Sequence, residues 1–329
     1  MVTMNPFKKL YMSILLLGLV LLLLTTATFA WLGLSNINTI DGLSLTATTG
    51  NFLEISFDGV NFATSLDPEL IAELIDNVRL ADVTTQDAID FYRGGLKDPN
   101  RAVTNRDYLS FTLWFRTVER ERHVFLVNNV NDQVSYDTTL RGTYFVSRGV
   151  TWRAPHTFIN GPEATDIVER GDQGVYYAAD AVRIGFVEQL DANNPLDERE
   201  VDTLRSLIYD PSENPERGFG KSYGMLSYFI ANTGQTDFSP PETFPDTQYR
   251  LTEFAPFNPY QALDNTSLIA ELVPNGEVNA EGRPYYIGKV QVTVWIEGWD
   301  ADAFDAIVND RLKIQLEFKS GMPHLNGSN

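Results

Sequence analysis

Apolar and polar residues alternate with a period of two along much of the chain. In the runs 109–115, 290–296 and 312–318, every second residue is Leu, Ile, Val or Phe. Successive side chains of a strand point to opposite faces, so each run has one apolar face and one mostly polar face, as in antiparallel sheets. Several such strands separated by turns predict a mainly β fold, an antiparallel β-sandwich of jelly-roll type. The predicted core contains Leu43, Leu45, Phe111, Leu113, Val292, Val294, Ile314, Leu316 and Phe318.

Short helices are predicted between the strands. Asp67 and Pro68 form a helix start, and Leu70, Ile71, Leu74, Ile75 and Val78 follow on one predicted apolar face. Further short helical stretches are predicted over 85–92, 197–209 and 300–309, the last with an aspartate as its N-cap.

Proline is concentrated between residues 188 and 285, which hold ten of the 16 prolines. Because proline cannot donate a ladder hydrogen bond, it is excluded from central strands. The segment is therefore predicted to be a long irregular insertion. The strands after it must close the fold, so residues 35–319 are expected to form one domain. Residues 320–329 are expected to be a disordered tail.

The N-terminal segment is a candidate export signal or membrane anchor. Lys8 and Lys9 precede an uncharged, leucine-rich run, and small residues ending at Ala30 provide a cleavage site. If uncleaved, residues 10–34 are long enough to cross a hydrocarbon core of ~30 Å as one apolar helix. Residues 1–34 are thus expected to be a signal peptide or an anchor with a cytoplasmic N-terminus. Both alternatives place the rest of the chain outside the cell.

The composition narrows the classes of function. Lys and Arg number 25 and Asp and Glu 44, which gives a formal net charge of −19. Such a polyanion repels nucleic acid, so nucleic acid is excluded as a partner. Cysteine is absent, which excludes disulfides, thiol catalysis and Cys-ligated metals, and the three histidines are too scattered for a His-based metal site.

Two hypotheses explain the acidic cluster of Asp300, Asp302 and Asp305. Carboxylates are the ligands that calcium prefers, so the cluster is the candidate calcium site of this chain. Capping of the predicted helix and a favourable interaction with its dipole is the alternative. The spacing lacks the glycine and the glutamate of an EF-hand loop.

Three tryptophans are candidates for ligand stacking. Trp114, Trp295 and Trp299 lie on or beside the strongest predicted strands. The first two alternate with core positions and therefore point to the opposite face of their strands. If exposed, these rings could stack on sugars; alternatively, a second layer or the long insertion covers that face.

No arrangement of residues singles out an active site. Residues 220–224 match the G-x-S-x-G pattern of a nucleophile elbow, but the prolines before them argue against the required buried strand. No pair among the 44 acidic residues is singled out for glycoside hydrolysis. We therefore expect a non-catalytic protein without a cofactor, apart from the candidate calcium.

The N-terminal region resembles the TasA/camelysin family. The resemblance rests on the Ala-Thr-Phe-Ala-Trp junction at 27–31 and on the strand Asp-Gly-Leu-Ser-Leu-Thr-Ala at 41–47. Members of that family are exported subunits of bacterial biofilm fibres with a β-sandwich fold. The resemblance implies an extracellular filament or surface subunit that associates with itself or with other surface proteins. It also implies an assembly strand carrying Leu43, Leu45 and Ala47. A carbohydrate-binding adhesin is the alternative, and a glycoside hydrolase is a distant third.

Overall fold

The computed structural model describes residues 37–48, 52–93 and 101–325. The predicted signal peptide or anchor at residues 1–34 lies outside these ranges. None of the helices within them has the length and apolar character needed to cross a membrane.

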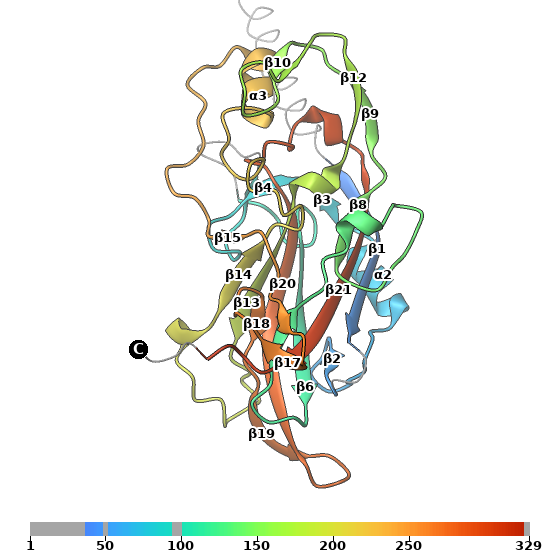
Figure 1. Ribbon diagram of the computed structural model, residues 1–329, viewed down its shortest axis with the longest axis vertical. Coiled ribbons are helices and arrows are strands. Elements are labelled where there is room, and N and C mark those ends of the chain that lie inside the picture. Colours follow the sequence, from blue (N-terminus) through green and yellow to red (C-terminus); the bar gives the residue numbers. More distant parts are fainter. Residues whose placement is uncertain (1–36, 49–51, 94–100, 326–329) are drawn as a thin grey trace, which may run out of the picture.

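Two large sheets form the body of the molecule (Figure 1). The first sheet is centred on β1 and β21 and contains β18 (Leu268–Ala270), β7 (His123–Leu126), β21 (Arg311–Gly321), β1 (Asn38–Ala47), β3 (Arg79–Leu80) and β8 (Tyr144–Ser147). The second is centred on β20 and contains β15 (Thr247–Gln248), β14 (Ser206–Tyr209), β13 (Val182–Gln189), β20 (Pro284–Glu297), β4 (Asp82–Thr84), β5 (Tyr92–Arg93), β6 (Leu109–Thr117), β2 (Glu54–Ser56) and β19 (Val273–Val278). The chain is therefore mainly β, as predicted.

Smaller elements decorate this body. Two-stranded ribbons are formed by β9 (Val150–Arg153) with β12 (Gln173–Tyr176), β10 (Phe158–Ile159) with β11 (Ile167–Val168), and β16 (Phe254–Ala255) with β17 (Asn258–Ala262). Within the described ranges, the α-helices are α2 (Pro68–Ile75) and α3 (Met225–Thr233), and short 3₁₀ turns occur at Asn131–Gln133, Ala178–Ala181, Val201–Thr203 and Asp305–Ile307. Figure 1 places α3 and the β9–β12 ribbons at one end of the molecule and the β19–β20 hairpin at the other.

Side chains from both large sheets meet in one hydrophobic core. Phe318 of β21 lies edge to face with Phe115 of β6 and Phe186 of β13, at ring-centroid distances of 5.0 and 6.4 Å. All nine predicted core residues belong to this cluster, so the core prediction is confirmed. The alternation identified the buried face correctly. A shift of one residue in strand register would turn the whole apolar set to solvent, so this register is strongly favoured.

The predicted antiparallel arrangement holds for most strand pairs but not for all of them. β1 runs parallel to β21, β4 runs parallel to β20, and β14 runs parallel to β15. The sheets are mixed, although most pairs within them are antiparallel. Alternation reports which face of a strand is buried and carries no information about the direction of its neighbour.

The first predicted helix is confirmed, and the others are not. In α2, the Asp67 carboxylate caps the helix by accepting a hydrogen bond of 2.9 Å from the Glu69 N–H. The stretch 85–92 forms bends before β5, 197–209 forms a 3₁₀ turn and β14, and 300–309 contains only the 3₁₀ turn Asp305–Ile307. Helix α3 was not predicted. Charges at helical spacing in 197–209 were misleading because strand pairing with β13 decides the conformation there.

The boundaries of the insertion and of the tail also need correction. Although 188–285 contains long irregular stretches, its strands β14, β18 and β19 belong to the two large sheets. The predicted tail begins too early, because Ser320 and Gly321 complete β21 and pair with β7. The chain is described as far as Leu325, and residues 326–329 lie outside the described ranges.

Candidate binding groove

An apolar groove of about 1030 Å³ lies beside α2 and β6. The wall on one side is α2, the wall on the other is the middle of β6, and the loop 57–66 closes the remainder. Phe57 and Phe111 meet edge to face in it, with ring centroids 5.8 Å apart. Because Phe111 belongs to the main hydrophobic core, the groove reaches from the surface to the core of the protein.

Helix α2 presents two apolar faces. Ile71 and Ile75 are buried in the core, whereas Leu70 and Leu74 line the groove. Leu70 is 54% exposed and lies beside the other apolar side chains that line the groove. An eight-residue helix is marginal by itself, so α2 depends on its capped start and on the packing of its buried face.

The β6 wall of the groove has an incomplete hydrogen-bond ladder. β20 pairs with β6 along its whole length from Leu109 to Thr117, but on the other side β2 pairs only with Trp114, Phe115 and Arg116. No described residue pairs with β6 between Leu109 and Leu113 on that side, a length of roughly 17 Å at ~3.4 Å per residue. An exposed strand edge of this kind is a template for another strand.

The alternation of hydrogen bonds along β6 identifies the group that faces the groove. The Ser110 N–H points away from β20 and is donated to Asn105 Oδ1 at 2.7 Å. Trp114 uses the same side of the strand to pair with Ser56 of β2. In an antiparallel ladder, every second residue bonds to the same neighbour, so the Thr112 N–H and C=O also point to this side. Thr112 lines the groove, and its N–H and C=O lie on the free edge.

Trp114 forms a fixed end wall of the groove. Its Nε1–H is donated to Asp191 Oδ2 at 3.0 Å, and the Lys289 ammonium lies 5.0 Å from its ring centroid. Gly59, at φ +72°, approaches the indole so closely that a Cβ there would lie 3.1 Å from Nε1. These three contacts hold the ring in place. Trp114 is thus the predicted stacking residue that lines this groove. It forms a wall, because much of its ring already contacts other groups of the protein.

Acidic side chains surround the groove. Asp58, Asp67 and Glu73 are the charged residues among its lining, and all three are carboxylates. Backbone N–H groups of Asn61 and Val60 donate to the Asp58 carboxylate and hold its pKa far below the usual range. Arg116, the cation next along β6, is paired with Glu54 at 2.7 Å. The groove is therefore apolar inside and negatively charged at its rim.

The other two predicted stacking tryptophans are buried, which contradicts their proposed role. Trp295 and Trp299 are each 1% exposed. Trp295 packs edge to face on Phe91, and Trp299 stacks on Phe238 of the proline-rich segment at a centroid distance of 4.9 Å. The alternative explanation, that this face is covered, is correct for both residues.

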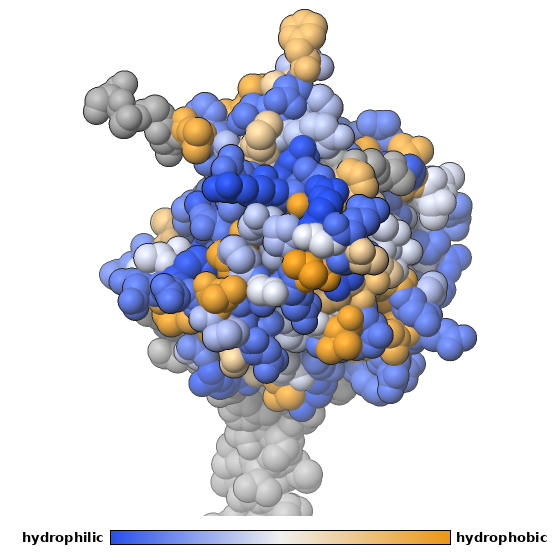
Figure 2. All heavy atoms as spheres, turned by 90° about the horizontal axis from the view of Figure 1, so that it is seen from below, coloured by the Kyte–Doolittle hydropathy of each residue, from blue (hydrophilic) through white to orange (hydrophobic). Residues whose placement is uncertain are grey.

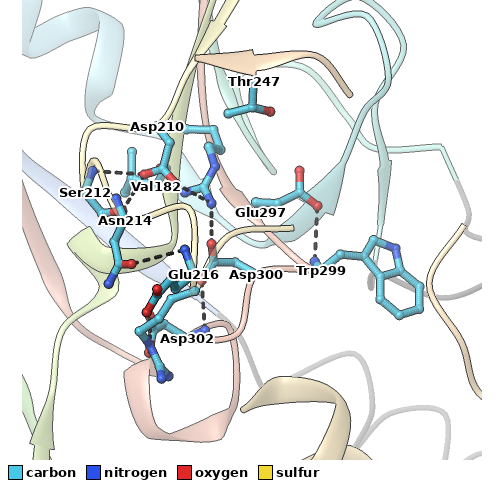
Figure 3. A network of polar contacts seen from close by, with 12 residues as sticks. Val182, Asp210, Ser212, Asn214, Glu216, Thr247, Glu297, Trp299, Asp300 and Asp302 are labelled. Carbon is cyan, nitrogen blue, oxygen red and sulfur yellow. Dashed lines mark hydrogen bonds and ion pairs between the residues drawn. The ribbon is translucent and has the colours of Figure 1, made fainter. Parts of the chain in front are cut away.

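The predicted calcium residues take part in separate protein contacts. Figure 3 shows Asp300 and Asp210 converging on one guanidinium, which belongs to Arg183 of β13. Asp302 forms an ion pair of 2.6 Å with Arg217, and Asp305 accepts a hydrogen bond of 2.7 Å from the Tyr228 hydroxyl. Over the described ranges, no three His, Cys, Asp or Glu side chains are grouped so that they could hold a metal ion. The acidic cluster connects loops to β13 and α3 in this structure.

The same network contains a buried carboxyl with an unusual pKa. Glu297 is 1% exposed and accepts hydrogen bonds from the Trp295 indole N–H at 3.0 Å and the Trp299 N–H at 3.1 Å. Burial raises its pKa from 4.5 to about 7, and these donors oppose that shift only in part. The folded protein therefore binds a proton at Glu297 in a pH range where the unfolded chain has released it.

We expect the free energy of unfolding to fall as the pH rises from about 4.5 to about 7, by up to about 3 kcal/mol from Glu297. The sign follows because the folded state holds more protons in this window. Asp180, whose pKa burial also raises to about 7, contributes in the same direction. Urea titrations at a series of pH values measure the free energy of unfolding. This free energy should fall less steeply with pH in Glu297→Gln than in the parent protein. An unchanged slope in Glu297→Gln would contradict the assignment.

The predicted assembly strand is part of the protein's own core. Leu43, Leu45 and Ala47 are buried, and β1 pairs with β21 through Leu43–Ile314, Leu45–Leu316 and Ala47–Phe318. On the other side, residues 64–66 bond to the end of β1. Within one chain, the apolar face of β1 is therefore already occupied.

A second hollow of about 620 Å³ is polar. It lies between the 131–137 loop, β8 and the 212–217 loop, and Asp180 is one of its lining residues. Neighbouring atoms remove water from this carboxyl and Asp302 repels its charge, which together raise its pKa. The Asp180 residue nevertheless retains an exposed surface, so the hollow is open to solvent.

Comparison with family models, with curated proteins and with solved structures returned no match. The resemblance of the N-terminal region to the TasA/camelysin family therefore stays a prediction. Function has to be inferred from the chemistry of the groove itself.

Sequence reasoning missed the groove as a site. Thr112 and Trp114 were recognised as residues on the polar face of a strand, and Leu70 as part of a helix face. The turn around Asp58 and Gly59 ends β2 at Ser56, but only the tertiary fold decides that β2 is the neighbour of β6 and that it stops before Thr112.

Proposed function

We propose that this chain is a non-catalytic, exported surface protein with a structural role, and that it joins a neighbouring polypeptide through the groove between α2 and β6. The neighbour would add one extended strand to the free edge of β6. The observation that carries this proposal is the unpaired edge at Thr112 directly beside apolar pockets that reach the core.

Strand addition uses both features of this groove. Backbone hydrogen bonds to the Thr112 N–H and C=O would give affinity that does not depend on sequence. Alternate side chains of the added strand would enter the apolar space between Phe111 and Leu74, and the side chains between them would face solvent. An assembly partner would thereby cover both the strand edge and the exposed part of Leu70.

We further propose that the two large sheets constitute the β-sandwich of jelly-roll type predicted from the sequence. The shared core between them supports this class. Export and attachment through residues 1–34 are proposed on the sequence of that segment. The neighbour can be a second copy, which would produce a filament, or a different surface protein.

Photo-cross-linking in the cells that produce the protein tests the proposal. We expect p-benzoylphenylalanine at position 70 to give adducts of higher mass, and mass spectrometry to locate the cross-link in an extended segment of a neighbouring chain. Position 89 is the matched control, because Ile89 is 60% exposed and does not line the groove.

Equal cross-linking at positions 70 and 89, or none at position 70, would contradict the proposed docking role. Electron microscopy of the same cells distinguishes a filament from a single-copy surface protein. Glycan binding that is lost when Trp114 is replaced would favour the carbohydrate-binding alternative.

A further inference from the structure

We propose that the strand that enters the groove is an apolar segment with lysine or arginine at its ends, and that it comes from a different protein rather than from a second copy of this chain. This inference rests on the proposed function and specifies the chemistry of the partner. It is drawn from the charges around the groove and the length of the free edge.

The rim of the groove selects for positive charge. Every charged residue that lines it is acidic, and Asp58 is held ionised by the backbone N–H donors of its turn. Glu73 lies on α2, in the turn that follows Leu70. A strand whose ends carry Lys or Arg would place cations beside these carboxylates, whereas acidic ends would be repelled.

The net charge of the chain argues against a second copy as the occupant. At −19, two copies repel each other at long range, and the same field attracts a cationic partner and raises its association rate. Figure 2 shows one end of the molecule, where hydrophobic residues appear only as separate patches within a hydrophilic surface.

The geometry limits the apolar part of the partner to a short segment. The unpaired edge from Leu109 to Leu113 is about five residues long, and its Ser110 N–H is already bonded to the Asn105 side chain, so a strand of at most about five residues fits. Trp114 closes the groove at the end where β2 begins to pair, so a longer strand would have to leave the sheet there. The positive residues are therefore expected to lie within a few positions of each end of a five-residue apolar core.

Two synthetic nine-residue peptides, Lys-Thr-Val-Thr-Val-Thr-Val-Thr-Lys and its variant with Glu at both ends, provide the test. Binding to the full-length chain in lipid nanodiscs is measured by fluorescence anisotropy at low and high salt. At low salt, we expect the Lys-ended peptide to bind at least about 10-fold more tightly than the Glu-ended peptide. This difference in affinity should become smaller at 1 M salt, where the Debye length falls to ~3 Å.

A variant that changes only the free edge keeps the test specific. Thr112→Pro removes the N–H that points into the groove and leaves the ladder to β20 intact, as proline is tolerated where the N–H faces away from a neighbour. This substitution should reduce the affinity for the Lys-ended peptide at least about 10-fold. Thr112→Val, which also loses the hydroxyl contact to Gln291, is the matched control and should bind as the parent does.

The outcomes separate the inference from the proposed function. Equal affinity for the two peptides, no binding of either, or binding unaffected by Thr112→Pro would overturn the inference. A cross-link from position 70 to a second copy would also overturn it while leaving the docking role in place. A cross-link to a basic-ended segment of another protein would support both.

Discussion

Replacing Arg183 by methionine is expected to cost about 3–5 kcal/mol of unfolding free energy, because it leaves two carboxylates buried without a counter-ion. The guanidinium of Arg183 is almost fully buried and contacts Asp210 Oδ2 at 2.8 Å and the Asp300 carboxylate. It also donates to the Val182 carbonyl at 2.7 Å. Chemical denaturation monitored by circular dichroism measures the loss.

Two controls show whether charge or packing is responsible. Arg311→Met removes an exposed arginine that pairs with Asp41 and should cost less than about 1 kcal/mol. Adding Asp210→Asn and Asp300→Asn to Arg183→Met should restore part of the stability, since neither position then carries an unpaired buried charge. A loss in Arg183→Met as small as that in Arg311→Met would show that the network does not hold the 210–217 and 300–302 loops.

Deleting residues 31–48 is expected to unfold the protein, because β1 lies between β21 and β3 inside the first sheet. The single substitution Leu45→Ala tests the same point more gently. With Leu45 only 1% exposed, we expect a loss of about 2–5 kcal/mol.

Leu70→Ala is the matched control for Leu45→Ala, since it removes the same atoms from a largely exposed leucine. It should change the unfolding free energy by less than about 1 kcal/mol. A soluble, cooperatively folding protein without residues 31–48 would contradict the position of β1 and would favour its predicted role as an assembly strand.

The period-two pattern predicted the mainly β fold and the core because both depend on local sequence. It could not predict the parallel pairing of β1 with β21, which links residues 43 and 314. It also could not predict the burial of Arg183, Trp295 and Glu297, which stand on the polar face of their strands. Loops from distant parts of the chain cover that face, and the alternation within a strand does not predict which segments pack on it.

The groove shows the same limit at the level of a site. Helical spacing grouped Leu70 with Ile71 and Ile75, although the first lines the groove and the others enter the core. Neighbouring helix positions differ by about 100°, so one broad apolar face can serve two surfaces. The acidic cluster at 300–305 was recognised from sequence, but its partners Arg183, Arg217 and Tyr228 are brought to it only by the tertiary fold.

Amide hydrogen exchange at Thr112 tests the central claim most directly. The measurement compares the free chain with the complex cross-linked at position 70, and the Phe111 and Leu113 amides, which bond to β20, serve as internal references. We predict rapid exchange of the Thr112 amide in the free chain and at least about 10-fold slower exchange in the complex. Protection of Thr112 in the free chain, or equal exchange in both samples, would contradict strand addition at this edge.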